Sequence, residues 1–120
     1  MPVTSVSSED HFLQLLNDKN YEFTFIDFYA LWCAPCIRFA PRLEVLSTKF
    51  TNVQFLKVNV DDVEELALRY GITGLPTFLM FERGNTVPID IPIIGANEEK
   101  VQDLLIRTVT SVPVLEEDDF

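Results

Sequence analysis

The 120-residue sequence is poor in the residues that build metal centres and disulfide frameworks, with two cysteines and one histidine. A structural zinc site needs about four ligands, so Cys33, Cys36 and the lone His11 do not suffice, and we expect no metal site. A disulfide stabilises a fold most when it closes a long loop, and a Cys33–Cys36 bond would close almost none. The two cysteines therefore indicate a reversible redox pair.

The sequence also lacks long apolar runs and an apolar leader. No run approaches the ~18 residues that a membrane span needs, so we expect no association with a membrane. The opening residues, MPVTSVSSED, are unlike a secretory signal, and we expect a cytoplasmic protein. Positive charge is scarce as well. The formal net charge of −10 argues against a nucleic-acid partner.

Four of the negative charges lie at the C-terminus, as Glu116, Glu117, Asp118 and Asp119. Because the sequence from Val112 onward has no helical or strand periodicity, we expect residues 110–120 to form a mobile acidic tail. We expect this tail to aid solubility, and docking on a basic partner is the alternative.

The rest of the chain, residues 1–109, contains enough apolar material for one domain, with 48% hydrophobic residues and ten phenylalanines in the sequence. Periodicity predicts five strands and four helices in the order βαβαβαββα. The expected strands are residues 3–6, 21–30, 53–60, 77–81 and 86–94, and the expected helices begin after Ser7 or Ser8, at Cys33, after the capping residues Asp61 and Asp62, and after Asn97.

This order predicts an α/β fold with a mixed central sheet of about five strands and four helices on both faces. Strands joined through helices pair in parallel, whereas the hairpin at residues 82–85 adds an antiparallel pair. Pro88 and Pro92 have no amide hydrogen to donate, which places the last strand at an edge of the sheet.

The stretch from Ile26 to Cys36 combines a buried strand with the start of a helix. Cys33 stands at the helix N-terminus, where free amides and the helix dipole favour a thiolate. Cys36 lies one turn further on the inward face, so the two sulfurs can meet. We expect Cys33 to attack an external disulfide and Cys36 to break the resulting mixed disulfide.

Asp27 interrupts the apolar strand that precedes the cysteines. Burial of its carboxyl would raise the pKa towards neutral, as a general base for the Cys36 thiol requires. The alternative is a carboxylate held only by hydrogen bonds to the backbone or to Ser and Thr. Lys57, on the neighbouring strand, could pair with Asp27, and the alternative for Lys57 is an ordinary surface position.

Residues 3 to 109 resemble the thioredoxin family. Trp32-Cys33-Ala34-Pro35-Cys36 is similar to the family's Trp-Cys-Gly-Pro-Cys, with Ala34 in place of the glycine and Pro35 retained. Residues 25–30 resemble the strand that carries the buried aspartate, although Tyr29 stands where many members have tryptophan. Further matches are Pro41, residues 57–61, residues 71–77, Gly84 and Gly95.

The resemblance implies a thioredoxin fold and a protein disulfide reductase with no cofactor beyond the Cys33–Cys36 disulfide. It also implies a cis peptide bond before Pro76 and recharging by thioredoxin reductase or a similar donor. Protein disulfides are the implied substrates, and we expect a monomer. The implied substrate surface consists of Trp32, Val60, Gly74, Leu75, Pro76, Ile94 and Gly95.

Two alternatives to the reductase remain open. A disulfide oxidase or isomerase would usually have a histidine between the cysteines and a secretory signal, and this chain has neither. A binding or adaptor module would use the same surface without the dithiol chemistry. Ala34, in place of the family's glycine, is expected to stiffen the active-site turn and to shift the redox potential.

Overall fold

The computed structural model describes residues 3–110, so the expected tail from residue 111 onward lies outside the described residues. Thr110, expected as the first tail residue, instead ends the last helix. The strands are β1 (Val3–Ser5), β2 (Phe23–Tyr29), β3 (Val53–Asn59), β4 (Thr77–Glu82) and β5 (Ile89–Ile94), and the helices are α1 (Glu9–Leu16), α2 (Ala34–Lys49), α3 (Glu64–Arg69) and α4 (Glu98–Thr110).

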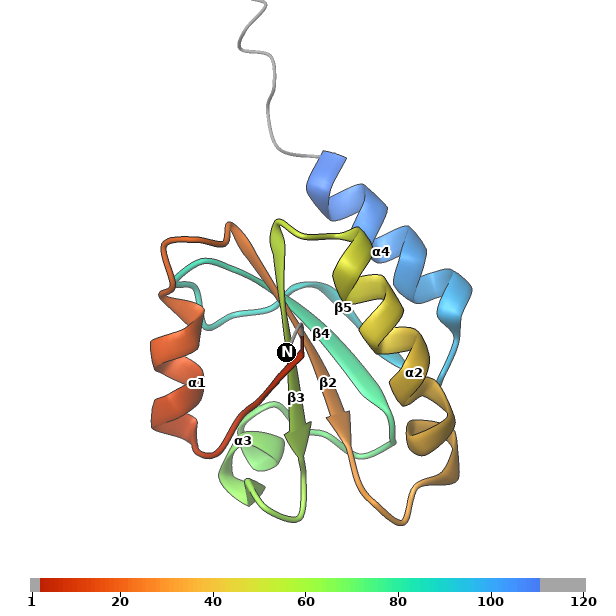
Figure 1. Ribbon diagram of the computed structural model, residues 1–120. Helices are drawn as coiled ribbons and strands as arrows, with labels where there is room; N and C mark the ends of the chain where they lie inside the picture. Colours follow the sequence, from red (N-terminus) through yellow and green to blue (C-terminus); the bar gives the residue numbers. More distant parts are fainter. Residues whose placement is uncertain (1–2, 111–120) are drawn as a thin grey trace, which may run out of the picture.

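The five strands form one mixed sheet in the order β1-β3-β2-β4-β5 (Figure 1). β3 pairs in parallel with both β1 and β2, because helical crossovers connect these strands. β4 runs antiparallel to β2 and to β5. The predicted α/β architecture is confirmed, and β5 lies at an edge, as the prolines indicate.

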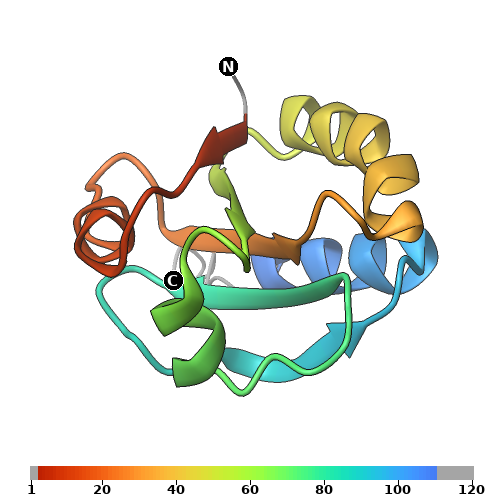
Figure 2. The same cartoon turned by 90° about the horizontal axis from the view of Figure 1, so that it is seen from below.

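Helices cover both faces of the sheet, α1 and α3 on one side and α2 and α4 on the other (Figures 1 and 2). One core packs Phe12, Leu16 and Leu66 against one face of the sheet. The other core packs side chains of α2 and α4, such as Leu43 and Leu104, against the opposite face.

The central strand β2 is buried from Phe23 to Phe28, and its side chains alternate between the two cores. Phe25 belongs to the core under α2 and α4, whereas Ile26 belongs to the core under α1 and α3. Because strand side chains alternate, Asp27 shares the face of Phe25, which is the face that α2 covers. The sheet thus places this acidic side chain beneath the helix that begins with the cysteines.

Several predicted boundaries differ from the structure. β2 begins at Phe23 rather than Tyr21, because the Tyr21 amide donates to the Asp18 carbonyl in the preceding turn, at 3.3 Å. β5 begins at Ile89, so Pro88 precedes it, and Asp90 in β5 has a left-handed φ of 66°. The strand register is irregular between Phe78 and Met80, opposite this segment of β5.

The helix caps are confirmed in two cases and wrong in one. Ser8 caps α1 by accepting a hydrogen bond from the His11 amide, and Asn97 Oδ1 accepts from the Lys100 amide at 3.0 Å in α4. α3 is capped by Val63 without a side-chain hydrogen bond, so the prediction of Asp61 and Asp62 as caps is wrong. No helix within residues 3–110 has the length and apolar character needed to cross a membrane.

Candidate functional site

Cys33 and Cys36 form a disulfide bond at the N-terminus of α2, with their Cα atoms 5.3 Å apart. Cys33 is the N-cap residue, and its Sγ accepts a hydrogen bond from the Cys36 backbone amide at 3.2 Å. Pro35 fits between them because first-turn amides have no acceptor within the helix. The helix N-terminus thus directs an amide to the sulfur predicted to be the nucleophile.

The disulfide is recessed in an apolar setting. Cys33 is 6% exposed and Cys36 is 3% exposed, and both pack with Ala30 and against Val60 and Leu75. Ala34, between the cysteines, is exposed and belongs to no core cluster of the described residues. The two sulfurs are therefore largely enclosed by apolar side chains.

The Leu75–Pro76 peptide bond is cis, as the family resemblance implies. Thr77 Oγ1 donates to the Gly74 carbonyl at 2.6 Å, which closes the turn before β4. The Gly95 amide donates to the Pro76 carbonyl at 2.8 Å. These bonds hold the turn and the end of β5 together beside the cysteines.

Asp27 is buried at 3% exposure, and its Oδ1 atom has no hydrogen-bond partner among the described residues. Burial raises the pKa of its carboxyl from 3.8 to about 7, while the positive charge of Lys57 lowers it. Burial dominates because the charged carboxylate loses its hydration. The alternative, a carboxylate fully held by hydrogen bonds, does not fit the unpaired Oδ1.

Lys57 is half-buried on β3, directly opposite Asp27 in the parallel register. Within residues 3–110 the two charges make no ion pair closer than 4 Å. Lys57 therefore acts on Asp27 by longer-range Coulomb attraction, which weakens but does not cancel the effect of burial.

An open cavity of about 370 Å³ joins Asp27 and Lys57 to Cys36. Strands β2 and β3 supply Asp27 and Lys57, and the first turns of α2 supply Cys36, Ala40 and Pro41. A carboxyl with a near-neutral pKa can exchange a proton with a thiol in such a space, directly or through water. The three residues predicted to act together thus line one cavity.

The residues predicted for substrate contact fall into two groups, side-chain positions and backbone positions. Trp32 and Ile94 are 71% and 63% exposed, whereas Val60 and Leu75 are half-buried against the cysteines. The second group consists of backbone positions. Gly74 allows a close approach, since a Cβ there would lie 2.9 Å from Cγ2 of Ile94, and Gly95 has a φ of 102°. The contact role of these residues stays a prediction.

The structure adds residues that the sequence analysis did not select. Trp32 Nε1 donates to Asp61 Oδ2 at 2.9 Å, so the aspartate expected as a helix cap orients the tryptophan instead. Trp32 follows the carboxyl end of β2 and Asp61 follows that of β3, and these two strands are parallel neighbours. From the sequence, this arrangement could have predicted that the two side chains lie close together. Leu31 is as exposed as Trp32, and Glu44 lines the Asp27 cavity. No motif marked either of them.

A metal-binding role finds no support in the described part of the chain. Residues 3–110 contain no group of three or more His, Cys, Asp and Glu side chains that could hold an ion. His11 lies on α1, where its Nδ1 accepts from the Ser7 amide at 3.0 Å. Its ring therefore has a local structural role at the start of that helix.

Known proteins resemble this chain along most of its length. The family model described as thioredoxin matches residues 3–107. Thioredoxin-2 of Pyricularia oryzae is 36% identical over 105 residues, which cover 88% of this chain but 58% of that protein. Thioredoxin of Equus caballus is 36% identical over 100 residues, covering 83% of this chain and 92% of the relative.

The fold agrees with these sequence matches. The X-ray structure of Fasciola hepatica thioredoxin superposes with a TM-score of 0.80 at 34% identity, covering 87% of this chain and 97% of the other. Together with the paired cysteines at the start of α2, these matches support dithiol–disulfide reductase chemistry. The chain belongs to the thioredoxin family.

Proposed function

We propose that this protein reduces disulfides of other proteins, with Cys33 as the attacking thiol and Cys36 as the resolving thiol. Family membership supports the reductase activity. The observation that carries the division of roles is the different setting of the two sulfurs. Cys33 receives an amide hydrogen bond at the helix start, whereas Cys36 lines the cavity of Asp27.

The first step forms a mixed disulfide. The Cys33 thiolate attacks one sulfur of the substrate disulfide, a new S–S bond forms, and the other substrate sulfur leaves as a thiolate that takes up a proton. The amide of Cys36 and the N-terminal end of α2 favour the thiolate form of Cys33. The recessed position of the disulfide restricts this attack to partners that fit the surrounding surface.

The second step releases the substrate. Cys36 transfers its proton to the Asp27 carboxylate and attacks Cys33 Sγ, which breaks the mixed disulfide and frees the second substrate thiolate. Two electrons thereby pass from the protein to the substrate, and the Cys33–Cys36 disulfide remains. Asp27 suits this role because its pKa of about 7 allows it to accept and return a proton near neutral pH.

The substrate surface in this proposal is the apolar rim around the cysteines, with Trp32 and Ile94 as its most exposed members among the predicted contacts. An extended substrate segment would lie beside Pro76, where backbone hydrogen bonds and apolar side-chain contacts can act together. The hydrogen bond to Asp61 fixes the orientation of Trp32 for such a contact.

The cycle closes when thioredoxin reductase or a similar donor reduces the disulfide, and it requires no other cofactor. We further propose a monomer that acts as an electron carrier in the cytoplasm. The acidic net charge of −10 supports a partner that is not nucleic acid.

The direct test mixes the reduced protein with a disulfide-bonded protein substrate and a recycling reductant. Catalytic release of substrate thiols is expected, and no turnover would contradict the proposal. A Cys33→Ser, Cys36→Ser double variant is the control. Full biological activity of that control would favour the binding or adaptor module instead.

The two thiol roles are tested by trapping. Cys36→Ser should accumulate a mixed disulfide through Cys33, because the resolving thiol is missing. Cys33→Ser should give no such adduct. Adducts on Cys36 in the Cys33→Ser variant, with none in Cys36→Ser, would reverse the assignment.

The redox potential separates the reductase from the oxidase or isomerase. A reductase should have a potential near the roughly −270 mV of thioredoxins, whereas a strong oxidant lies near about −120 mV. Equilibration with glutathione buffers measures this value. A strongly oxidising result would replace the reductase proposal with the alternative.

A further inference from the structure

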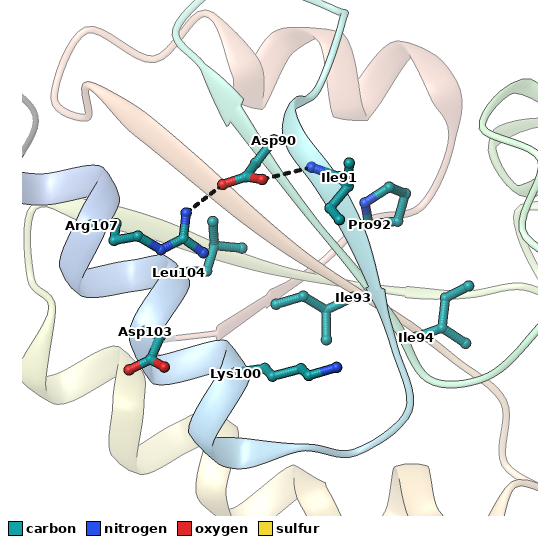
Figure 3. Close-up of a pocket in the computed structure, with 9 residues that line it drawn as sticks. All are labelled: Asp90, Ile91, Pro92, Ile93, Ile94, Lys100, Asp103, Leu104 and Arg107. Atoms are coloured by element: carbon teal, nitrogen blue, oxygen red, sulfur yellow. Dashed lines mark hydrogen bonds and ion pairs between the residues drawn. The ribbon is translucent and has the colours of Figure 1, made fainter.

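A second groove lies between β5 and α4, outside the disulfide site (Figure 3). It has a volume of about 330 Å³. Three isoleucines of β5 and three residues of α4 form most of its two walls: Ile91, Ile93, Ile94, Lys100, Leu104 and Arg107. The proposed redox chemistry uses only Ile94 of this set, so the groove needs its own explanation.

One end of the groove is fixed by Asp90. Its Oδ2 accepts from Arg107 Nη1 at 2.6 Å, and its Oδ1 accepts from the Ile91 amide at 2.9 Å. The bond to Arg107 ties β5 to the last turn of α4, and the bond from the Ile91 amide, within β5, orients the Asp90 carboxylate, as Figure 3 shows. These hydrogen bonds of Asp90 therefore define the shape of the groove at this end.

The strand wall is apolar and lacks a neighbour on its outer side. Ile91 is 77% exposed and Ile94 is 63% exposed. β5 ends the sheet with β4 as its sole partner in residues 3–110, so its outer edge is free to bind another extended segment.

The helix wall adds a cation at the other end. Lys100 extends along the groove towards the end of β5, whereas the carboxylate of Asp103 points the opposite way (Figure 3). Lys100 makes no ion pair within the described part of the chain. An occupant that is apolar beside Leu104 and acidic beside Lys100 would match both walls.

We propose that residues 112–119 of the same chain occupy this groove. Their sequence is Val-Pro-Val-Leu followed by Glu-Glu-Asp-Asp, so four apolar residues precede four acids. Val112 precedes a proline and is therefore biased towards an extended conformation. The segment starts directly after α4, the helix that forms one wall.

The length of the segment fits this path. From Thr110 back to Lys100 along α4 is about 15 Å at the helical rise. An extended chain covers that distance in about five residues. After a short turn, Val114 and Leu115 would pass Leu104, and Glu116 and Glu117 would reach Lys100.

The charges favour the same direction. In this direction the acidic residues end beside Lys100. The apolar residues lie at the other end of the groove, where the charge of Arg107 is already paired with Asp90. Because an exposed ion pair contributes little, the apolar contacts and the charge contact must act together. Ile94 also belongs to the predicted substrate surface, so a seated segment would lie next to that surface.

The test places a spin label on Phe120→Cys in a full-length Cys33→Ser, Cys36→Ser background and records amide NMR intensities. This label site leaves all four acids intact. The amides of Ile93, Ile94 and Lys100 should lose most of their intensity, while those of α1 keep theirs. Even, slight losses over the whole surface would overturn the proposal.

Two matched variants test the charge contact. Adding Lys100→Glu should restore most of the lost intensity, whereas Lys19→Glu, at an exposed lysine between α1 and β2, should not. Equal effects of the two variants would contradict the role of Lys100. The amide spectrum itself shows whether each variant is folded.

A mixed sample identifies which chain supplies the segment. Spin-labelled chains without isotope are mixed with isotope-labelled chains without spin label. No loss of intensity is expected, because the segment binds its own groove. Loss at Ile94 and Lys100 in this mixture would overturn the proposal in favour of a second copy of the chain.

Discussion

Asp27 on β2 and Asp90 on β5 show how differently one fold can treat the same side chain. Asp27 is 3% exposed, its Oδ1 is unpaired among the described residues, and its pKa is raised to about 7 by burial. Asp90 is exposed, and the hydrogen bond from Arg107 lowers its pKa, helped by the Ile91 amide.

A nearby cation does not by itself decide the protonation of a carboxyl. Both aspartates face one, but Arg107 bonds directly to Asp90, while Lys57 acts on Asp27 without a direct ion pair. Hydrogen bonds and hydration hold Asp90 as a carboxylate with a structural role. Asp27 has lost its hydration without full replacement, which leaves its proton exchangeable near neutral pH.

The largest expected effect is on stability. The folded protein keeps a proton on Asp27 up to pH about 7, whereas the unfolded chain releases it near 3.8. The free energy of unfolding therefore falls as pH rises through this window. At pH 8, Asp27→Asn should stabilise the oxidised protein by up to about 4 kcal/mol, since it removes the buried charge. Urea unfolding measures the change, and equal gains at pH 4 and pH 8 would contradict this cause.

The second effect is on the resolving step. Without a base in the cavity, Asp27→Asn should slow release of the second substrate thiol about 10²-fold. Single-turnover kinetics on reduced protein measure the rate. In the unsubstituted protein the rate should rise with pH through a midpoint near 7, and this rise should be absent in the variant. An unchanged rate would remove Asp27 from the mechanism.

Lys57 provides a smaller change at the same cavity. Lys57→Met removes the attraction that lowers the pKa of Asp27, so that pKa should rise above about 7. The midpoint of the resolving rate should shift upwards by the same amount. Lys19→Met is the matched control at an exposed lysine and should leave the midpoint in place.

The smallest effect is expected at Asp90. Asp90→Asn loses the charged bond to Arg107, but asparagine tolerates the left-handed φ of 66°. Because the pair is largely exposed, unfolding should become easier by less than about 1 kcal/mol. Turnover should stay unchanged. A large loss of turnover would show that the two aspartates differ less in role than their settings indicate.

The sequence was sufficient to predict the element order, the mixed sheet and the cysteine pair. Apolar periodicity predicted the helices and strands, and the prolines predicted that the last strand lies at an edge, because both signals depend only on residues close in sequence. The burial of Asp27 also followed from its place in an apolar strand. The family resemblance, rather than any local rule, predicted the cis bond before Pro76.

Features that depend on contacts between distant segments were not predictable. Asp61 follows a strand and precedes a helix, which is typical of a cap, yet it bonds to Trp32 from a neighbouring strand end. The left-handed Asp90 and its bond to Arg107 likewise depend on how α4 packs against β5. Sequence patterns report on residues that are close along the chain, whereas these contacts join residues that are far apart in sequence.

The most direct test of the account is an NMR titration of the side-chain carboxyl carbons in the oxidised protein. Asp27 and Asp90 can be followed in the same sample, with Asp27→Asn and Asp90→Asn to assign them. We expect Asp27 to titrate near pH 7 and Asp90 below 3.8. If both aspartates titrated near pH 3.8, burial would not raise the pKa of Asp27. Asp27 could then not exchange a proton near neutral pH, and the proposed role of the cavity would be wrong.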